Sequence, residues 1–245
     1  MSQRRRELTA KLEPFDSFWE APDDIESGYR SFQLFYHDNY ARFFPTDKGA
    51  NILCVSCGPG YGVSLLNQLG YRNVLGIDSF ADKIAHGRRR DLNCRVAYAF
   101  DFLADAADGC YDLIFVEQEL NHLTKDEILE FLELCRRKLK PGARFICFVL
   151  NGANPITGAE ALAQNFDHYN TFTEYTLRQV LGHVGFTGIE VFDLNLYVFY
   201  RNPLNYVAMA AAGLLKLLFR ACYVLYGKKN RLFSKKIAAA CVRPA

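Results

Sequence analysis

The sequence predicts an α/β fold: a doubly wound, mostly parallel sheet of seven strands with helices on both faces. Two observations lead to this prediction. From residue 51 onward, short apolar segments alternate with segments in which apolar residues recur at helical spacing. The short segments are apolar along most of their length, which is typical of parallel strands buried on both faces. A helical segment is expected before the sheet, and a helical insertion before its last strand.

The predicted elements follow from this alternation. Aromatic residues at helical spacings indicate an amphipathic helix over 27–44. Strands are expected at 51–56, 73–78, 94–100, 111–117, 144–150, 189–194 and 234–244. Helices are expected between them at 61–70, 79–91, 125–140 and 173–186. The chain is therefore expected to divide into an N-terminal helical segment or lid (1–45), a ligand-binding core (46–200), and an amphipathic helical insertion with the final strand (201–245).

Composition narrows the classes of function. A chain of 245 residues is long enough for one α/β domain with additions. Its net charge of +2 is too small to indicate nucleic-acid binding, so no nucleic-acid partner is expected. The polar N-terminus has no apolar run of signal-peptide type, which favours a cytoplasmic protein. The eight cysteines are accordingly expected to be reduced.

The stretch from Ile52 to Gly62, ILCVSCGPGYG, contains a Cys-x-x-Cys pair. If 51–56 is a strand, Cys54 and Cys57 point to opposite faces, with Cα atoms roughly 10 Å apart at ~3.3 Å per residue. A disulfide needs about 4.4–6.8 Å. A four-cysteine zinc site would need a second pair at comparable spacing, which the sequence lacks. The pair is therefore interpreted as incidental to redox or metal chemistry.

The glycine-rich loop after this strand is the stronger signal. Gly58 and Gly60 stand between a predicted strand and a predicted helix, where glycine lets the backbone approach a ligand. A dinucleotide fingerprint would place its third glycine at Val63, which disfavours an NAD site. Asp78 ends the next strand and can accept both hydroxyls of a ribose, with a helix cap as the alternative. Asp101 ends the third predicted strand, at the same edge of the sheet.

With these features the chain resembles class I S-adenosylmethionine-dependent methyltransferases, from about Asn51 to Leu194. The resemblance implies a Rossmann-like sheet, methyl-transfer activity and S-adenosyl-L-methionine as the cofactor. Its most specific part runs over 111–152: a strand, a His-Leu pair, a helix ending Arg-Lys-Leu-Lys-Pro-Gly and another strand, in the family's order. The segments that carry the resemblance are CGPGYG, VLGIDSFADKIAHGR, YDLIFVEQELNHLTKDEILEFLELCRRKLKPGARFICFVLNG and FTEYTLRQVLGHVGFTGIEVF.

The resemblance also implies roles for individual residues. Gly58 and Gly60 would hold the methionine end of the donor, Asp78 its ribose, and Asp101 with Phe102 the adenine. In full, the cofactor-binding residues are expected to be Ser56, Gly58, Gly60, Asp78, Ser79, Asp101, Phe102 and Glu117.

The chain departs from the family at several positions. Glu117 would lie between donor and acceptor. The family usually has an acid where this chain has Cys54, and a glycine where it has Ser56. Because the missing carboxylate would help to orient the donor's amino group, Cys54→Asp is expected to tighten donor binding. A metal-dependent subset carries Glu-x-x-Glu-His where this chain has Gln118 and Asn121. Amides are poor substitutes for hard anionic ligands, so no metal is expected.

The acceptor side is less specified. Transfer of an activated methyl group depends mainly on alignment and exclusion of water, and a general base is needed only for a weakly acidic hydroxyl. The candidate catalytic bases are His122 and His168, for each of which a structural role is the alternative. Tyr29, Tyr36 and Tyr169 are candidate walls of a substrate pocket, with aromatic core packing as the alternative.

The C-terminal insertion carries a further signal. Residues 206–226 are apolar apart from Lys216 and Arg220, which are spaced i, i+4 on one face. The region 205–226 is expected either to lie in a membrane interface or to be a buried helix in an acceptor lid or dimer contact. The ending FSKKIAAACVRP resembles bacterial methyltransferases of surface-polysaccharide biosynthesis, whose acceptors include lipid-linked sugars.

The leading hypothesis is therefore a methyltransferase that acts on a hydroxyl of a sugar, glycan or related small molecule, with a saccharide acceptor that is free or lipid-linked. A secondary-metabolite O- or N-methyltransferase is the alternative within the class. A non-catalytic donor-binding protein and an NAD-binding oxidoreductase are alternatives outside it. The protein is expected in the cytoplasm, at the inner face of the membrane if 205–226 binds lipid. The oligomeric state is left open.

Overall fold

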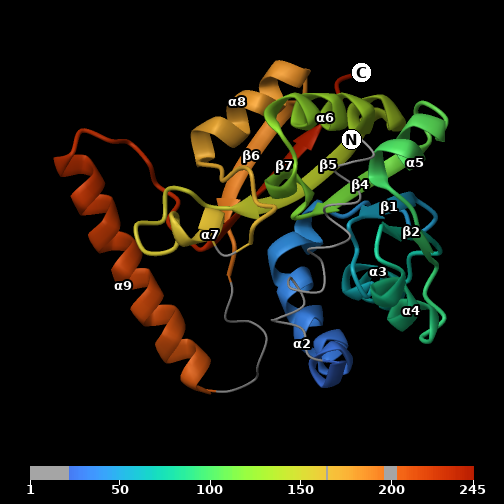
Figure 1. Cartoon of the computed structure of the whole chain (residues 1–245), viewed down its shortest axis with the longest axis horizontal. Helices are drawn as coiled ribbons and strands as arrows, with labels where there is room; N and C mark the ends of the chain where they lie inside the picture. Colours follow the sequence, from blue (N-terminus) through green and yellow to red (C-terminus); the bar gives the residue numbers. More distant parts are fainter. Residues whose placement is uncertain (1–21, 164, 196–202) are drawn as a thin grey trace.

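The structure, a computed structural model, describes residues 22–163, 165–195 and 203–245 (Figure 1). Its strands are β1 (Asn51–Val55), β2 (Asn73–Asp78), β3 (Cys94–Val96), β4 (Tyr111–Glu117), β5 (Leu139–Leu150), β6 (Thr187–Asp193) and β7 (Lys236–Val242). Its helices are α2 (Pro22–Tyr40), α3 (Tyr61–Gln68), α4 (Ala81–Arg88), α5 (Ala99–Asp105), α6 (Lys125–Lys138), α7 (Glu160–Ala163), α8 (Glu174–Val184) and α9 (Pro203–Leu225). Two 3-10 turns are η2 (Ala41–Phe43) and η3 (Glu119–His122).

The seven strands form one sheet in the order β3-β2-β1-β4-β5-β7-β6. The strands from β3 across to β5 pair in parallel, and β7 runs antiparallel to both β5 and β6. The strand order reverses beside β1, between β2 and β4, which is the switch point where α/β sheets bind ligands. The predicted doubly wound, mostly parallel sheet is confirmed.

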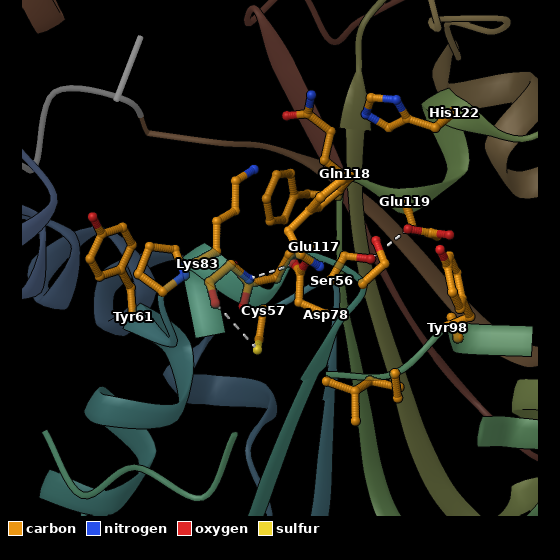
Figure 2. Close-up of a pocket in the computed structure, with 18 of the residues that line it drawn as sticks. Ser56, Cys57, Tyr61, Asp78, Lys83, Tyr98, Glu117, Gln118, Glu119 and His122 are labelled. Atoms are coloured by element: carbon orange, nitrogen blue, oxygen red, sulfur yellow. Dashed lines mark hydrogen bonds between the residues drawn. The ribbon is translucent and has the colours of Figure 1, made fainter. Parts of the chain in front are cut away.

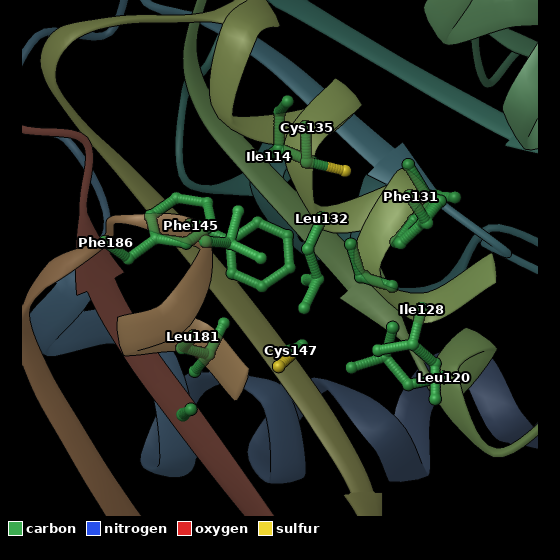
Figure 3. Close-up of a cluster of buried hydrophobic side chains, with 14 of the residues drawn as sticks. Ile114, Leu120, Ile128, Phe131, Leu132, Cys135, Phe145, Cys147, Leu181 and Phe186 are labelled. Carbon is green, nitrogen blue, oxygen red and sulfur yellow. The ribbon is translucent and has the colours of Figure 1, made fainter. Parts of the chain in front are cut away.

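Helices cover both faces of the sheet. Figure 1 shows α2, α3 and α4 below the sheet, and α5, α6 and α8 above it. Side chains of β1 alternate between two apolar clusters, with Ile52 and Cys54 facing α2 and α3, and Leu53 and Val55 facing α6. Figure 3 shows the second cluster, where side chains of α6, β5 and α8 meet. This burial on both faces explains why the strands are apolar throughout.

The third predicted strand is wrong over its second half. β3 ends at Val96, and helix α5 begins at Ala99 after the extended residue Tyr98. The segment places Phe100 and Leu103, three residues apart, into the core, a spacing that helical burial favours over the alternation of a strand. Asp101 therefore lies in the first turn of a helix and not at a strand end.

Other boundaries also differ from the prediction, and the first helix, expected over 27–44, is α2 (Pro22–Tyr40). Helix α6 ends at Lys138 and β5 begins at Leu139, because Leu139 is already extended and pairs with Tyr111.

Helix α9 stands away from the sheet in Figure 1, and of its described residues none is buried. The expectation of a helix buried within this chain is therefore wrong, which leaves a membrane or a partner chain as its surroundings.

Candidate functional site

A cavity of about 430 Å³ opens at the carboxyl ends of β1, β2 and β4 (Figure 2). This volume is within the usual range for small-molecule sites, and its position is the one expected for an open α/β sheet. Helix α2 contributes Phe32 and Tyr36 to its wall, and the start of β7 contributes Lys235 and Lys236. The cavity therefore lies between the N-terminal helix, the switch point and the C-terminal strand.

The glycine loop presents open backbone to this cavity. Gly58 has a φ of +52°, and a Cβ placed there would have no atom within 4 Å. Gly60 differs from it, because its φ of +88° makes the turn that starts α3, and a Cβ there would lie 3.1 Å from Cys94 Sγ. Gly58 lines the cavity, whereas Gly60 is not among its described lining residues. The predicted ligand contact therefore fits Gly58, and Gly60 serves the turn.

Side chains from other elements hold the loop in place. Ser56, at a φ of +56°, lines the cavity and donates its hydroxyl to Glu119 of η3. Tyr29 of α2 donates its hydroxyl to the Pro59 carbonyl at 2.5 Å and is itself buried, which raises its pKa to about 12. Tyr29, predicted as a wall of the substrate pocket, is not among the described lining residues of the cavity; its ring packs against Tyr61, and its hydroxyl positions the loop.

Asp78 joins the glycine loop to the next strand. One carboxylate oxygen accepts from the Gly58 N–H at 2.9 Å, and the other accepts from the Phe80 N–H at 3.0 Å. Asp78 and its neighbour Ser79 line the cavity. Each carboxylate oxygen has a second lone pair, so the side chain can hold the loop and still accept from a ligand hydroxyl. The alternative role of Asp78, a helix cap, is met only in part. Asp78 accepts from the Phe80 N–H, but the N-cap residue of α4 is Phe80 itself.

Glu117 occupies the end of β4, beside Ser56 and Asp78 in Figure 2. Its Oε2 accepts a hydrogen bond from the hydroxyl of Tyr36, and its Oε1 is buried with no hydrogen-bond partner among the described residues. Burial raises the pKa of the Glu117 carboxyl to about 8, although the hydrogen bond from Tyr36 opposes this shift. The carboxyl is therefore largely protonated at pH 7, and a cation bound beside it would favour its ionised form.

A histidine–aspartate pair stands on another side of the cavity. His122 Nδ1 lies 2.9 Å from Asp167 Oδ2, and both residues line the cavity. Burial alone would raise the pKa of the Asp167 carboxyl, but the hydrogen bond and charge of His122 bring it below its ordinary value. Asp167 is therefore an anion at neutral pH. Its other oxygen, Oδ1, is buried and has no hydrogen-bond partner in the described part of the chain.

His168 packs behind this pair. Its ring lies edge-on to that of His122, with centroids 4.6 Å apart, and its Nδ1 lies 2.7 Å from the Ala161 carbonyl oxygen. Burial, together with the charge of His122, lowers the pKa of His168 below its ordinary value, so the ring is neutral at pH 7. His168 is not among the described lining residues of the cavity. Its position suits a packing group better than the predicted catalytic base.

Three more predicted residues lie away from the cavity. Asp101 is exposed in α5, Phe102 packs against the core cluster on the α6 face, and Tyr169 is 43% exposed. The adenine role given to Asp101 and Phe102 depended on a strand that ends at 100, and β3 ends at Val96. The structure instead brings Tyr98 into the cavity just after β3. A strand end placed four residues earlier would have identified Tyr98 from the sequence.

The polar and aromatic lining residues that sequence reasoning missed come from loops, from helix α4 and from the start of the last strand. They are Phe80, Lys83, Tyr98, Asn165, Asp167, Lys235 and Lys236. Among the described residues, one group could hold a metal ion: ligand atoms of His122, Asp167 and His168 lie within 4.8 Å of one another. The expectation of no metal therefore stays a prediction, which chelation can test.

Comparison with known proteins identifies the family. A family model described as a methyltransferase domain matches residues 29–191. The chain belongs to the class I S-adenosylmethionine-dependent methyltransferase family. A probable S-adenosylmethionine-dependent methyltransferase from Mycolicibacterium smegmatis is 26% identical over 147 residues, which are 60% of this chain and 56% of that protein. The chain thus spans little more than half the length of this relative.

Solved structures show the same fold. A methyltransferase from Archaeoglobus fulgidus has a TM-score of 0.65 at 18% identity, covering 91% of this chain and 100% of its own. Phosphoethanolamine N-methyltransferase 2 from Haemonchus contortus, in complex with phosphomonomethylethanolamine and S-adenosylhomocysteine, has a TM-score of 0.67 at 16% identity. That match covers 96% of this chain and 60% of the other.

The cavity fits the cofactor of the family, S-adenosyl-L-methionine. The open backbone at Gly58 leaves room for the ligand that a Cβ would fill. Asp78 offers a carboxylate to ribose hydroxyls, and the buried Oε1 of Glu117 offers an acceptor to the cationic methionine end. The aromatic ring of Tyr98 provides an apolar face suited to a base.

Proposed function

We propose that this chain transfers a methyl group from S-adenosyl-L-methionine to a hydroxyl group of its acceptor, with His122 as the general base. The observation that carries the proposal is the His122–Asp167 pair, whose nitrogen and oxygen atoms lie 2.9 Å apart at the wall of the cavity. A neutral amine acceptor can attack the methyl group with its own lone pair and needs no histidine–aspartate pair. A hydroxyl acceptor has to lose a proton to a base.

The residues divide the chemistry between them. When bound, the cofactor supplies an activated methyl group on a sulfonium. Asp167 accepts from Nδ1 of His122, which sets the tautomer in which Nε2 carries the lone pair and stabilises the imidazolium after proton transfer. His122 takes the proton of the acceptor hydroxyl. Phe32 and Phe148 line the cavity with apolar surface that excludes water from the reacting atoms.

For the acceptor, we infer a saccharide or related small molecule, free or lipid-linked. Support comes from the polar groups beside the histidine: Asn165 and Gln118 can hydrogen-bond to sugar hydroxyls, and Lys235 with Lys236 adds positive charge to the cavity wall. Two lysines suit an acceptor that carries a phosphate, as sugars joined to lipids by phosphate do. A secondary-metabolite hydroxyl remains the alternative acceptor.

The test combines donor binding with a radiolabelled methyl-transfer assay on sugars, sugar phosphates, phenols and amines. His122→Ala and Asp167→Asn are expected to lower kcat about 10²- to 10⁴-fold, with the affinity for S-adenosylhomocysteine unchanged. The alkaline rise in the pH profile of kcat, measured at saturating donor, should disappear in His122→Ala. His183→Ala, in helix α8, is a matched control that should leave the rate unchanged. Transfer to amines only, or full activity in both variants, would contradict the proposal.

A further inference from the structure

Helix α9 carries its large aliphatic side chains on its outer side, away from the body of the protein. The side that faces the body of the protein is a stripe of partly buried positions at helical spacing: 205, 208, 212, 216, 219 and 223. This stripe includes the polar residues Asn205 and Lys216 and the hydroxyl of Tyr223. In an ordinary amphipathic helix of a soluble protein, the body-facing stripe would be aliphatic and the outer side polar.

The outer side of α9 is apolar and exposed. Val207, Leu214 and Leu225, spaced by seven and eleven residues on one face, are 66%, 69% and 85% exposed. The remaining large apolar side chains of this outer face are also exposed: Tyr206, Leu217, Leu218 and Val224. A contiguous apolar surface of this length is unfavourable in water, so an apolar surrounding is expected to cover it.

The charge around α9 points to the nature of that surrounding. Between 203 and 236 the chain has seven basic residues and no acidic residue, whereas its net charge as a whole is only +2. The seven are Lys216, Arg220, Lys228, Lys229, Arg231, Lys235 and Lys236. A second copy of this chain would bring the same positive charge to the contact and be repelled. The headgroups of an anionic bilayer are complementary to it.

The contacts of α9 also fix its orientation. Lys216, near the middle of the helix, pairs with Asp193 of β6 at 3.0 Å. Tyr223, near its end, donates to the Ala153 carbonyl at 2.7 Å and packs on Phe233, with ring centroids 4.8 Å apart. The helix has the length and composition to cross a membrane. Crossing would draw the Lys216–Asp193 pair into the hydrocarbon, at a cost that an in-plane position avoids.

We propose that α9 docks this protein on an anionic membrane, lying in the plane of the interface with its outer apolar face among the acyl chains. The same basic segment continues through Lys235 to Lys236, which line the cavity. The basic segment after α9 therefore joins the docked helix to the cavity wall at the start of β7. In combination with the proposed function, this favours an acceptor presented by the bilayer.

Vesicle flotation of the full chain tests the docking. The protein is expected to float with vesicles of phosphatidylcholine and phosphatidylglycerol, and to float less with phosphatidylcholine alone or at high salt. Leu214→Glu with Leu218→Glu should abolish flotation. Lys228→Glu with Lys229→Glu should lower the affinity for anionic vesicles at least tenfold, since each basic residue contributes roughly fivefold. Ala104→Glu with Ala107→Glu adds the same two negative charges as the double leucine variant, at exposed positions on and just after α5, and should float normally.

Three outcomes would overturn the docking proposal. The first is no flotation of the unchanged protein. The second is a dimer in sedimentation that Leu214→Glu with Leu218→Glu converts to a monomer, which would make α9 a contact between copies. The third is resistance of the bound protein to alkaline carbonate extraction, which would indicate a spanning helix. Binding of S-adenosylhomocysteine is measured on every variant, so that misfolding and failure of the proposed function are distinguished from loss of docking.

Discussion

Glu117 should make the stability of the folded protein depend on pH, and Glu117→Gln should remove that dependence. Burial raises the pKa of this carboxyl from 4.5 to about 8. Between these values the folded protein keeps a proton that the unfolded chain releases, so stability is fully present at low pH and falls as the pH rises. A difference of this size corresponds to at most about 5 kcal/mol, at 1.36 kcal/mol per pKa unit. The loss levels off once the folded carboxyl itself ionises.

Denaturant unfolding of both proteins measures this effect. Between about pH 5 and about pH 8, the unchanged protein is expected to lose about 3–4 kcal/mol more unfolding free energy than Glu117→Gln. Comparison of the two slopes cancels the titration of every other group. Glu130→Gln is a matched control, because Glu130 is exposed on α6, and its slope should equal that of the unchanged protein. Equal slopes for the unchanged protein and Glu117→Gln would refute the argument that burial keeps Glu117 protonated.

Three further predictions concern the same region. Cys54→Asp is expected to lower the free energy of unfolding by about 2–4 kcal/mol and not to tighten donor binding. The reason is that Cys54 is fully buried and a carboxylate there would face Glu117. Calorimetry with S-adenosylhomocysteine measures the donor affinity, with Cys54→Ser as the control. Gly28→Ala is expected to cost about 1–3 kcal/mol of stability, because its Cβ would overlap the Tyr61 ring. Gly213→Ala, in open space on α9, should be neutral or stabilising, and thermal unfolding measures both variants. Methyl transfer is expected to persist in EDTA. If EDTA abolishes the activity and one divalent metal restores it, His122, Asp167 and His168 form a metal site.

The sequence identifies the parts of the site that follow from strand ends. The apolar run of β1 and the glycines after it locate Gly58, and the next strand end locates Asp78. The adenine side fails for a specific reason: CRVAYAF is apolar enough for a strand, yet its second half begins helix α5. Local composition does not distinguish these states, because the burial of Phe100 and Leu103 against α6 decides them.

Other parts of the site depend on contacts between distant segments. Tyr36 and Glu117 are 81 positions apart, and His122 and Asp167 are 45 apart. Each of these side chains is ordinary in its own segment. Their chemistry arises only when α2 packs over β4 and when the loop before α8 folds back on η3. No periodicity or spacing in a single sequence specifies such a meeting, so Asp167 went unpredicted and Tyr36 was assigned only a role in packing or as a pocket wall.

Each half of the cavity depends on a side chain without its proton, Glu117 in the donor half and His122 in the acceptor half. The cationic end of the donor is bound best when Glu117 has lost its proton, and its pKa of about 8 places that loss just above neutral pH. His122 can accept a proton from the acceptor only in its neutral form. Both requirements are met as the pH rises, so donor affinity and turnover should increase together toward mildly alkaline pH. Because the buried Oε1 of Glu117 exists whether or not an acceptor is present, the increase in donor affinity is a property of the donor half alone. It should therefore survive in Asp167→Asn, which separates the donor half from the acceptor half of the site.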